Sequence, residues 1–360
     1  MKHLILCPIF ICQIWLGYGG TWTVSNNPAI PAQFTSIPAA IASAASGDTI
    51  LVSGSPTSYS GSITINKAIS IIGAGYNPNL GLTTSLNLLI VSRSNVFLSG
   101  FKVNQIRLTG QNAPANLIEN VTITRCDVAL LIVQGLTNNS GSSAVLKRFT
   151  VRNNLLEDVT LSGNYSNRYT TLDSVWISNN IFTQFGRIGG ANALTGTDKL
   201  IVEHNLFIGG NVPNKSVFGD YFFQNYLDNA VIKDNIFYAS DPQGCQNCLY
   251  FNNLTFQNGA NDTLPAPAGN NNIYSQNPLF GNFPVNGASF NYQFDFSLLP
   301  NSPAINAASD GTNIGISGGG QPFEIGAPPA LPKITDLTLF HTAIPENGSL
   351  QIEFKAINQP

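Results

Sequence analysis

The sequence is short of charge, and it has no long apolar run outside its first residues. Only 10% of the 360 residues are charged, compared with about a quarter in an average soluble domain, and the formal net charge is −3. A surface this poor in lysine and arginine excludes a nucleic-acid binder that works by neutralising phosphates. No run of about 18 apolar residues follows the N-terminus, so we expect no membrane span in the mature chain.

Asparagine and glycine take the place of the missing charges. The chain holds 43 asparagines and 33 glycines, both above ordinary usage. Its apolar content of 43% is too high, and its charge too low, for a disordered chain. The composition therefore predicts a folded protein whose surface consists mostly of neutral polar groups.

Residues 1–20 have the pattern of a secretion signal. Met1 to His3 give a short positive start, and an apolar run extends from Leu4 to Leu16. Glycines follow, which places the expected cleavage between Gly17 and Thr21. The apolar run is too short for a typical span, although a retained membrane anchor is the alternative. We expect a mature protein that is secreted or held at the cell surface.

Three cysteines remain beyond this segment: Cys126, Cys245 and Cys248. An odd number in an exported chain allows at most one bridge and leaves one free thiol. The close spacing of Cys245 and Cys248 favours a small loop disulfide or two idle thiols. Zinc needs four ligands, and only His204 and His341 remain as imidazoles, so no metal or cofactor is expected.

The middle of the chain is a repeat. Five segments at intervals of 25 to 30 residues share an alternating strand pattern, which ends in cysteine in the first and in asparagine in the other four: residues 121–126, 149–154, 175–180, 200–205 and 230–235, with a weaker copy at 251–256. One column of the repeat is entirely β-branched, which suits a strand with one buried face: Ile123, Val151, Ile177, Val202 and Ile232.

The asparagines at the ends of these segments interrupt the alternation, so a turn must follow each strand. Asparagine tolerates the left-handed conformation that such a turn needs, and stacked asparagines can hydrogen-bond into a ladder. The ladder residues are Asn154, Asn180, Asn205, Asn235 and Asn253. Rungs of about 25 residues with three short strands and turns predict an all-β fold, a right-handed parallel β-helix.

The two ends of the chain complete this organisation. Residues 35–45 have helical spacing and suit a cap over the first rung. Residues 334–344 and 349–356 have the pattern of two strands. The sequence thus predicts a signal peptide at 1–20, one β-helix over 21–329, and a C-terminal β hairpin or cap over 330–360.

A family resemblance supports this fold. Residues 47–76 (GDTILVSGSPTSYSGSITINKAISIIGAGY) resemble the N-terminal cap and first coils of exported pectate-lyase-like β-helix proteins. Residues 302–329 (SPAINAASDGTNIGISGGGQPFEIGAPP) are similar to the closing segment of β-helix proteins exported by Bacteroidota. The resemblance implies the fold but no single activity, since that superfamily contains lyases, hydrolases, esterases, epimerases and non-catalytic binders.

The known catalytic sets of these relatives are missing from the sequence. Residues 173–179 resemble a pectate-lyase strand, but Ser178 and Asn179 occupy the places of its aspartate and histidine, and no Arg-x-Pro-x-x-Arg run occurs. The aspartate cluster and Gly-His-Gly of pectin hydrolases and the Gln-Asp segment of pectin esterases are also absent. His204 precedes a ladder asparagine, which favours a turn residue over a catalytic base.

One outward face of the repeat carries the candidate site. If the β-branched column points inward, Thr124, Arg152, Ser178, Glu203 and Lys233 stack outside, beside a column that contains Trp176. The charges could form a cross-rung salt ladder, worth about 0–1 kcal/mol per exposed pair. They could equally line a glycan groove in which Trp176 stacks on a sugar. The candidate substrate-binding residues are Arg152, Trp176, Glu203 and Lys233.

The sequence therefore favours an exported, monomeric β-helix protein that binds extracellular or cell-surface polysaccharide without catalysis. One alternative is a polysaccharide lyase or glycoside hydrolase with an atypical site. Arg152, Glu203 and Lys233 are capable of acid–base chemistry, and Arg187 and Lys199 are further candidates in loops. The other alternative is a structural or adhesive surface protein. No catalytic residue is assigned.

Overall fold

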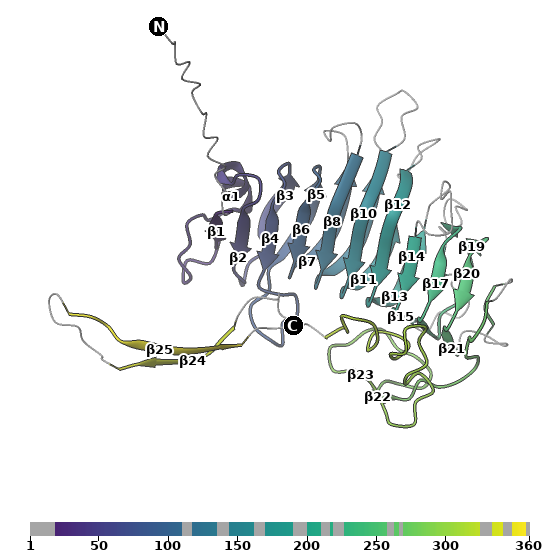
Figure 1. The fold of residues 1–360 in the computed structure, drawn as a ribbon. Helices are drawn as coiled ribbons and strands as arrows, with labels where there is room; N and C mark the ends of the chain where they lie inside the picture. The colour runs from purple at the N-terminus through teal and green to yellow at the C-terminus, as the bar shows by residue number, and fades with distance from the viewer. Residues whose placement is uncertain are drawn as a thin grey trace, which may run out of the picture.

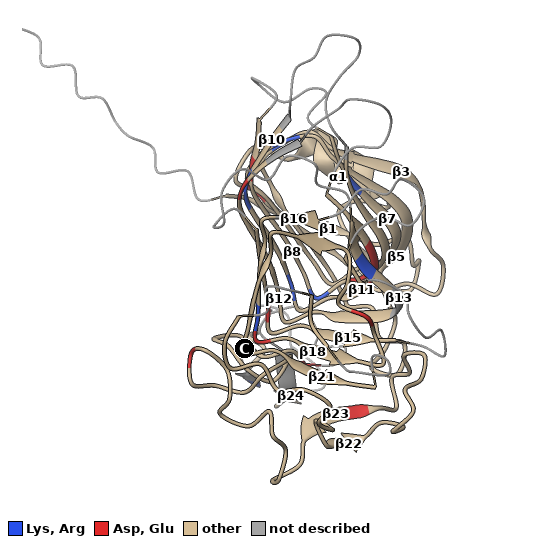
Figure 2. Cartoon of the chain, turned by 90° about the vertical axis from the view of Figure 1, so that its right-hand side faces the viewer, with Lys and Arg blue, Asp and Glu red and all other residues tan. Residues whose placement is uncertain are grey.

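The chain forms a right-handed parallel β-helix (Figure 1). The computed structural model describes residues 19–109, 117–134, 144–161, 170–189, 200–209, 217–218, 227–257, 263–265, 269–324, 333–340 and 348–357. Successive strands mostly alternate between two parallel sheets, which we call sheet 1 and sheet 2. Most of the described rungs therefore have two main strands and not the predicted three. Figure 2, turned by 90°, shows strands of the two sheets on opposite sides of one interior.

Sheet 1 holds ten strands within the described ranges: β1 (Thr21–Val24), β2 (Thr49–Val52), β4 (Ser70–Gly73), β6 (Val96–Ser99), β8 (Leu117–Thr124), β10 (Ala144–Arg152), β12 (Thr170–Ser178), β14 (Leu200–Glu203), β17 (Val231–Lys233) and β20 (Leu249–Phe251). Sheet 2 holds nine over the same ranges: β3 (Tyr59–Ile65), β5 (Ser85–Val91), β7 (Lys102–Thr109), β9 (Asp127–Gln134), β11 (Leu155–Thr160), β13 (Ile181–Gly189), β15 (Leu206–Ile208), β18 (Ile236–Tyr238) and β21 (Leu254–Phe256).

The interior follows the predicted columns. Ile123, Val151, Ile177, Val202 and Ile232 are in register on neighbouring strands of sheet 1, and all five are fully buried. In sheet 2, the rings of Phe182, Phe207 and Phe237 stack, with centroid separations of 4.5 and 5.0 Å. In these columns, β-branched and aromatic side chains remove apolar surface from water.

The turn between the two sheets contains the asparagine ladder. The side-chain oxygen of Asn180 accepts hydrogen bonds from both the backbone N–H and the side-chain amide of Asn154, each at 3.0 Å. The amide of Asn180 in turn donates to the carbonyl of Val151 at 2.9 Å. The same pattern continues through Asn205, Asn235 and Asn253 to Asn272. The ladder therefore satisfies backbone groups that the turn would otherwise leave unpaired inside the protein.

One detail of the predicted turn is wrong. The left-handed residue is the one before each ladder asparagine, with φ between 51° and 58° at Asn153, Asn179, His204, Asp234 and Asn252. This placement lets the ladder side chain point into the protein, while the preceding residue points outward to meet other parts of the chain. We call these outward residues, together with Arg125 (φ 53°), the turn column.

The N-terminal helix and the C-terminal hairpin are both present. Helix α1 (Ile37–Ser43) buries Ile37, Ala40 and Ile41, and it is shorter than the predicted range of 35–45. The ammonium group of Lys67 donates to the carbonyl oxygens of Ala42, in the last turn of the helix, and of Ala44, the residue that caps its end. Near the C-terminus, β24 (Lys333–Leu339) and β25 (Ile352–Ile357) pair antiparallel. The smaller strand pairs are β16 (Leu227–Asp228) with β19 (Cys245–Gln246), and β22 (Phe280–Asn282) with β23 (Asp295–Leu298).

The segment of residues 302–324, which we call the strap, packs against the outside of the β-helix. Its Ile314, Ile316 and Phe323 belong to a second apolar cluster with a column of sheet 2 that follows the ladder asparagines. That column is Leu155, Ile181, Leu206, Ile236 and Leu254. In Figure 1 the yellow-green part of the chain lies below the strands, so the strap covers the edge where the strands of sheet 1 end.

Candidate functional site

The strap contacts the turn column in reverse chain order. Asn252 donates to the carbonyl of Ala307 at 3.0 Å, and Asp234 accepts from Ser309 at 2.6 Å. Further along the strap, Asn179 donates to the carbonyl of Gly318 at 2.9 Å, and Asn153 donates to that of Pro322 at 3.4 Å. The strap therefore runs back along the β-helix, from the last rungs of the β-helix toward Arg125.

His204 is held beneath a glycine turn of the strap. A Cβ added to Gly318 would lie 2.7 Å from Nδ1 of His204, and one added to Gly319 would lie 3.1 Å from its Cδ2. Its Nε2 lies 3.4 Å from a carboxylate oxygen of Asp310 and 3.8 Å from one of Asp234. Because the ring is almost fully buried, His204 is a structural residue of the turn, as the sequence pattern favours, and is not exposed to a substrate.

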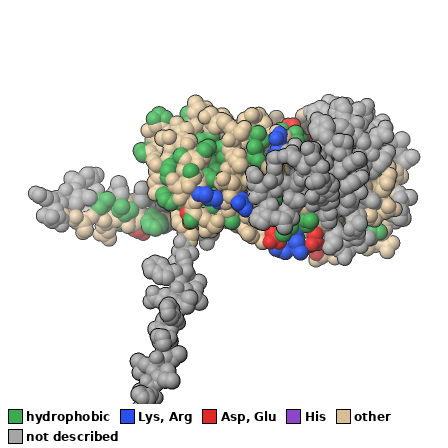
Figure 3. Space-filling model, turned by 90° about the horizontal axis from the view of Figure 1, so that it is seen from above, with side chains coloured by type: hydrophobic (Ala, Val, Ile, Leu, Met, Phe, Trp, Pro, Cys, Tyr) green, Lys and Arg blue, Asp and Glu red, His purple; other side chains and the backbone are tan. Residues whose placement is uncertain are grey.

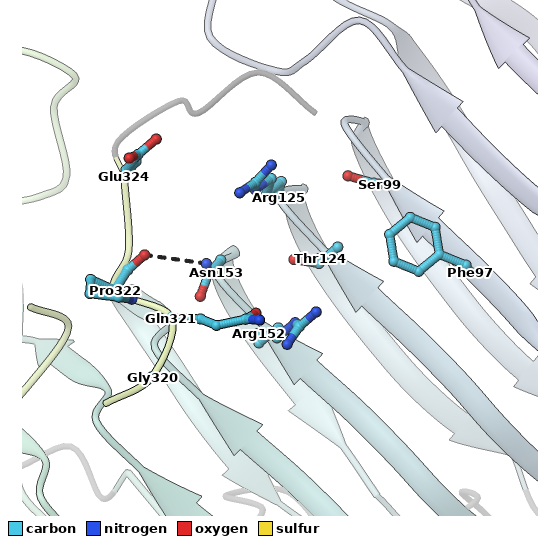
Figure 4. Close-up of a pocket in the computed structure, with 10 residues that line it drawn as sticks. All are labelled: Phe97, Ser99, Thr124, Arg125, Arg152, Asn153, Gly320, Gln321, Pro322 and Glu324. Carbon is cyan, nitrogen blue, oxygen red and sulfur yellow. Dashed lines mark hydrogen bonds between the residues drawn. The ribbon is translucent and has the colours of Figure 1, made fainter. Parts of the chain in front are cut away.

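A pocket of about 520 Å³ lies where the end of the strap faces sheet 1 (Figure 4). The sheet and the turn column contribute Phe97, Ser99, Thr124, Arg125, Arg152 and Asn153, and the strap contributes Gly320, Gln321, Pro322 and Glu324. In Figure 4 the side chain of Gln321 extends from the strap toward Arg152, and Glu324 lies at the other end of the strap segment. This volume is within the range of small-ligand sites.

Arg152 gives the pocket its main electrostatic feature. Burial lowers the pKa of Arg152, and the nearby charge of Arg125 lowers it further. Within the described residues, no carboxylate lies at ion-pair distance from Arg152. Burial also lowers the pKa of Arg125, against the opposing effects of Glu324 and Tyr76. A half-buried guanidinium without a counter-ion is costly, and an anionic ligand would offset that cost.

Asn153 adds an unpaired acceptor to the pocket wall. The residue is 7% exposed, and its Oδ1 has no hydrogen-bond partner among the described residues. Only its amide nitrogen is engaged, through the bond to Pro322. A buried carbonyl oxygen without a donor costs about 1–3 kcal/mol, so this atom favours a ligand that brings a hydroxyl or N–H group.

Glu203 and Lys233, two of the predicted binding residues, form a salt bridge of 2.8 Å. Lys233 also lies 3.4 Å from Asp234 and 3.3 Å from the hydroxyl of Ser309. Burial alone would lower the pKa of Lys233, but the hydrogen bond and charge of Glu203, followed by those of Asp234, raise it overall. Glu203 and Lys233 therefore form the cross-rung salt bridge that the sequence offered as the alternative to a glycan groove. Because its pKa is raised, Lys233 stays charged and is unsuited to act as a base.

Trp176 lies in the outer column beside that of Arg152. It is in register with Thr150 and Ile201, and 38% of its surface is exposed. It does not line the pocket. Its exposed ring is still available as a flat stacking surface on the same face of sheet 1.

The other singled-out residues lie elsewhere. Arg187 forms an ion pair of 2.7 Å with Asp158 on sheet 2, and Lys199 lies outside the described residues. Cys245 and Cys248 are joined by a disulfide, and burial raises the pKa of the free Cys126 to about 12. Over the described ranges, no group of three or more histidine, cysteine or acidic side chains is placed to hold a metal ion.

A second cavity of about 410 Å³ lies at the opposite ends of the sheet 1 strands, lined by Lys67, Arg93 and Glu119 among others. Its charged groups already have partners. Glu119 pairs with Arg148 at 2.6 Å, Arg93 donates to the carbonyl of Asn66, and Lys67 binds the end of α1. Figure 3, a view from above, shows acidic side chains beside basic ones at one edge of the molecule. This cavity is therefore a weaker candidate.

Sequence reasoning did not identify Arg125, Asn153, Gln321 and Glu324 as site residues. The repeat places Arg125 and Asn153 in the turn column, but nothing in the repeat indicates that the strap returns across that column. The partner atoms on the strap at Asn153 and Asn179 are backbone carbonyls, which leave no side-chain pattern.

Comparison with known proteins assigns neither a family nor a function. No family model matches the chain, and no curated protein matches it. Across the residues that the structure describes, no helix is long and apolar enough to cross a membrane.

Proposed function

We propose that this chain is an exported β-helix protein of the pectate-lyase-like group, of the type found in Bacteroidota, that binds an extracellular or cell-surface polysaccharide. The pocket at Arg152 is the proposed binding site, and an acidic sugar is the proposed contact. The observation that carries this proposal is a half-buried guanidinium that faces a 520 Å³ pocket without a described carboxylate partner. Guanidinium binds a carboxylate or sulfate through paired, charge-assisted hydrogen bonds.

The rest of the pocket suits a sugar. Ser99, Thr124, Asn153 and Gln321 offer hydroxyl and amide groups, and Phe97 offers an apolar ring. Ligand sites of this kind combine apolar walls with a few polar groups that fix orientation. The export part of the proposal is supported by the signal-like residues 1–20 and by the disulfide, since disulfides persist mainly in oxidising compartments. We expect the mature protein to act as a monomer.

Affinity electrophoresis of the mature protein in gels that contain acidic or neutral polysaccharides tests the binding site. We expect at least one acidic polymer to retard the protein, and the variant Arg152→Gln to lose that retardation. Lys355→Gln makes the same change in charge at an exposed ion pair outside the pocket and should behave like the parent protein. Equal retardation of the parent and Arg152→Gln by every polymer would contradict the site. An absence of retardation by any polymer would favour a structural role.

The lowered pKa of Arg152 also favours a second candidate, a polysaccharide lyase. A neutral guanidine can accept the proton from the sugar carbon next to a carboxylate. The bond from the neighbouring carbon to the leaving oxygen then breaks, a carbon–carbon double bond forms, and water supplies the proton for the leaving oxygen. Since only the deprotonated guanidine can act, this activity should rise with pH. Ultraviolet absorbance of the unsaturated product, compared between the parent and Arg152→Gln, tests this candidate. An unchanged polymer at alkaline pH would leave binding as the function.

A further inference from the structure

The outer face of sheet 1 places a single unpaired charge between neutral neighbours. The column of Arg152 continues through Thr124 and Ser99 in one direction and through Ser178 in the other. Beyond Ser178 come Glu203 and Lys233, which neutralise each other at 2.8 Å. Among the described residues of this column, Arg152 is therefore the only charge left without a partner.

The adjacent outer column carries no charge over the same rungs. Its described members are Phe97, Thr122, Thr150, Trp176, Ile201 and Val231. Rungs are spaced by about 4.8 Å, so this adjacent column offers neutral contacts for two or more rungs on each side of Arg152. The column of Arg152 itself offers two neutral rungs toward Ser99 and one toward Ser178. Within these two columns, a chain lying across the rungs would meet Arg152 as the one unpaired charge and otherwise mostly hydroxyl and apolar groups, while Arg125, in the turn column of the same pocket, faces Glu324.

Two electron-rich groups in the pocket make the binding of a second negatively charged group of the ligand unfavourable. Glu324 projects from the strap as a carboxylate near Arg125, as Figure 4 shows. The buried Oδ1 of Asn153 is a second electron-rich atom, and it needs a hydrogen-bond donor. A second carboxylate bound here would face like charge and would leave Asn153 unsatisfied, whereas a sugar hydroxyl would complete the site.

We infer that the pocket selects a polysaccharide whose acidic groups are isolated along an otherwise neutral chain, and that it rejects polymers with a carboxylate on every sugar. This inference rests on the proposed polysaccharide binding and assigns the two selective groups. Arg152 holds the one acidic group, and Glu324 with Asn153 requires that the adjoining sugar be uncharged and rich in hydroxyls.

Three polymers separate this selectivity from simple charge attraction. Glucuronoxylan has a neutral backbone with occasional glucuronate groups, xylan stripped of those groups is neutral, and polygalacturonate has a carboxylate on each sugar. Titration calorimetry with the mature protein should give about tenfold tighter binding to glucuronoxylan than to either other polymer. The affinity for glucuronoxylan should also fall only weakly with salt, because a single charge pair is formed.

Two variants test the assigned roles. Arg152→Gln should bind glucuronoxylan no better than the neutral xylan. Glu324→Gln should raise the affinity for polygalacturonate several-fold and leave that for glucuronoxylan nearly unchanged. Lys355→Gln is the charge control for Arg152→Gln, and Asp336→Asn, which removes one negative charge at the same exposed ion pair, is the control for Glu324→Gln. Polygalacturonate binding as tightly as glucuronoxylan, or an unchanged ratio in Glu324→Gln, would overturn the inference while leaving polysaccharide binding intact. If none of the three polymers bound, both the proposed function and this inference would fail.

Discussion

Ser309 donates both its backbone N–H and its hydroxyl to the carboxylate of Asp234, each at 2.6 Å across 75 residues of sequence. Asp234 is fully buried and stands in the turn column, and Ser309 belongs to the strap. The same carboxylate lies 3.4 Å from the ammonium of Lys233. This pair therefore fixes the strap, and with it one wall of the pocket, to the rungs of the β-helix.

Replacing Asp234 with alanine should release this part of the strap. The two donors of Ser309 would lose their acceptor, and a buried, hydrogen-bonded carboxylate would be removed, which costs about 2–4 kcal/mol. Urea denaturation of Asp234→Ala should show that loss in the free energy of unfolding, and limited proteolysis should cut the strap sooner. Asp336→Ala removes an acid from an exposed ion pair and should change little. Matching unfolding curves for the two variants would show that the Asp234 contact contributes little.

The ladder should be more sensitive to substitution than other asparagine pairs. Asn180→Ala would deprive the backbone N–H and the side-chain amide of Asn154 of their shared acceptor, and would leave the carbonyl of Val151 without its donor. Because Asn180 is fully buried, we expect a loss of about 2–4 kcal/mol in the free energy of unfolding. Asn87→Ala breaks an exposed asparagine pair with Asn104 and should cost under about 1 kcal/mol. Chemical denaturation of both variants measures the loss in the free energy of unfolding. Equal losses for Asn180→Ala and Asn87→Ala would show that burial does not set the size of that loss.

The glycine turn of the strap offers a matched comparison. A Cβ at Gly318 would collide with the carbonyl of Asn313 and approach Nδ1 of His204 to 2.7 Å, whereas a Cβ at Gly320 meets nothing within 4 Å. Gly318→Ala should therefore destabilise the protein by about 1–3 kcal/mol, as overpacking does, and Gly320→Ala should be nearly neutral. Thermal unfolding would measure both. Similar melting temperatures for the two variants would mean that the strap can shift away from His204 at little cost.

The fold was predictable because each rung repeats the same local pattern. The β-branched column at Ile123 and Val151 and the ladder at Asn154 and Asn180 place the same residue types at the same point of every turn, so the period alone indicates stacking. Asn153 and Asn154 show the limit of such reasoning. Both are asparagine, yet one takes the left-handed conformation at the strap and the other joins the ladder.

The site was harder to predict because two distant segments form it. Arg152 was identified from the outward column, but its pocket depends on Gln321 and Glu324, more than 160 residues further along the chain. The strap meets this column partly through backbone carbonyls, which any residue can supply. Glu203 and Lys233 were grouped with Arg152 because they share its column, and the structure separates them because each neutralises the other.

Acid should loosen the N-terminal cap through Asp48. Hydrogen bonds from the indole of Trp22 and from the backbone N–H groups of Ala45 and Gly20 lower the pKa of this carboxyl below its usual value of 3.8. A lowered pKa in the folded state means that the stabilisation is present above the unfolded pKa and is lost as the pH falls through the folded value. The fluorescence of Trp22, followed in a Trp176→Phe background that leaves it the only tryptophan after residue 20, should therefore change below about pH 4. Asp48→Asn should abolish that transition, and a transition that persists in Asp48→Asn would assign it to another acid.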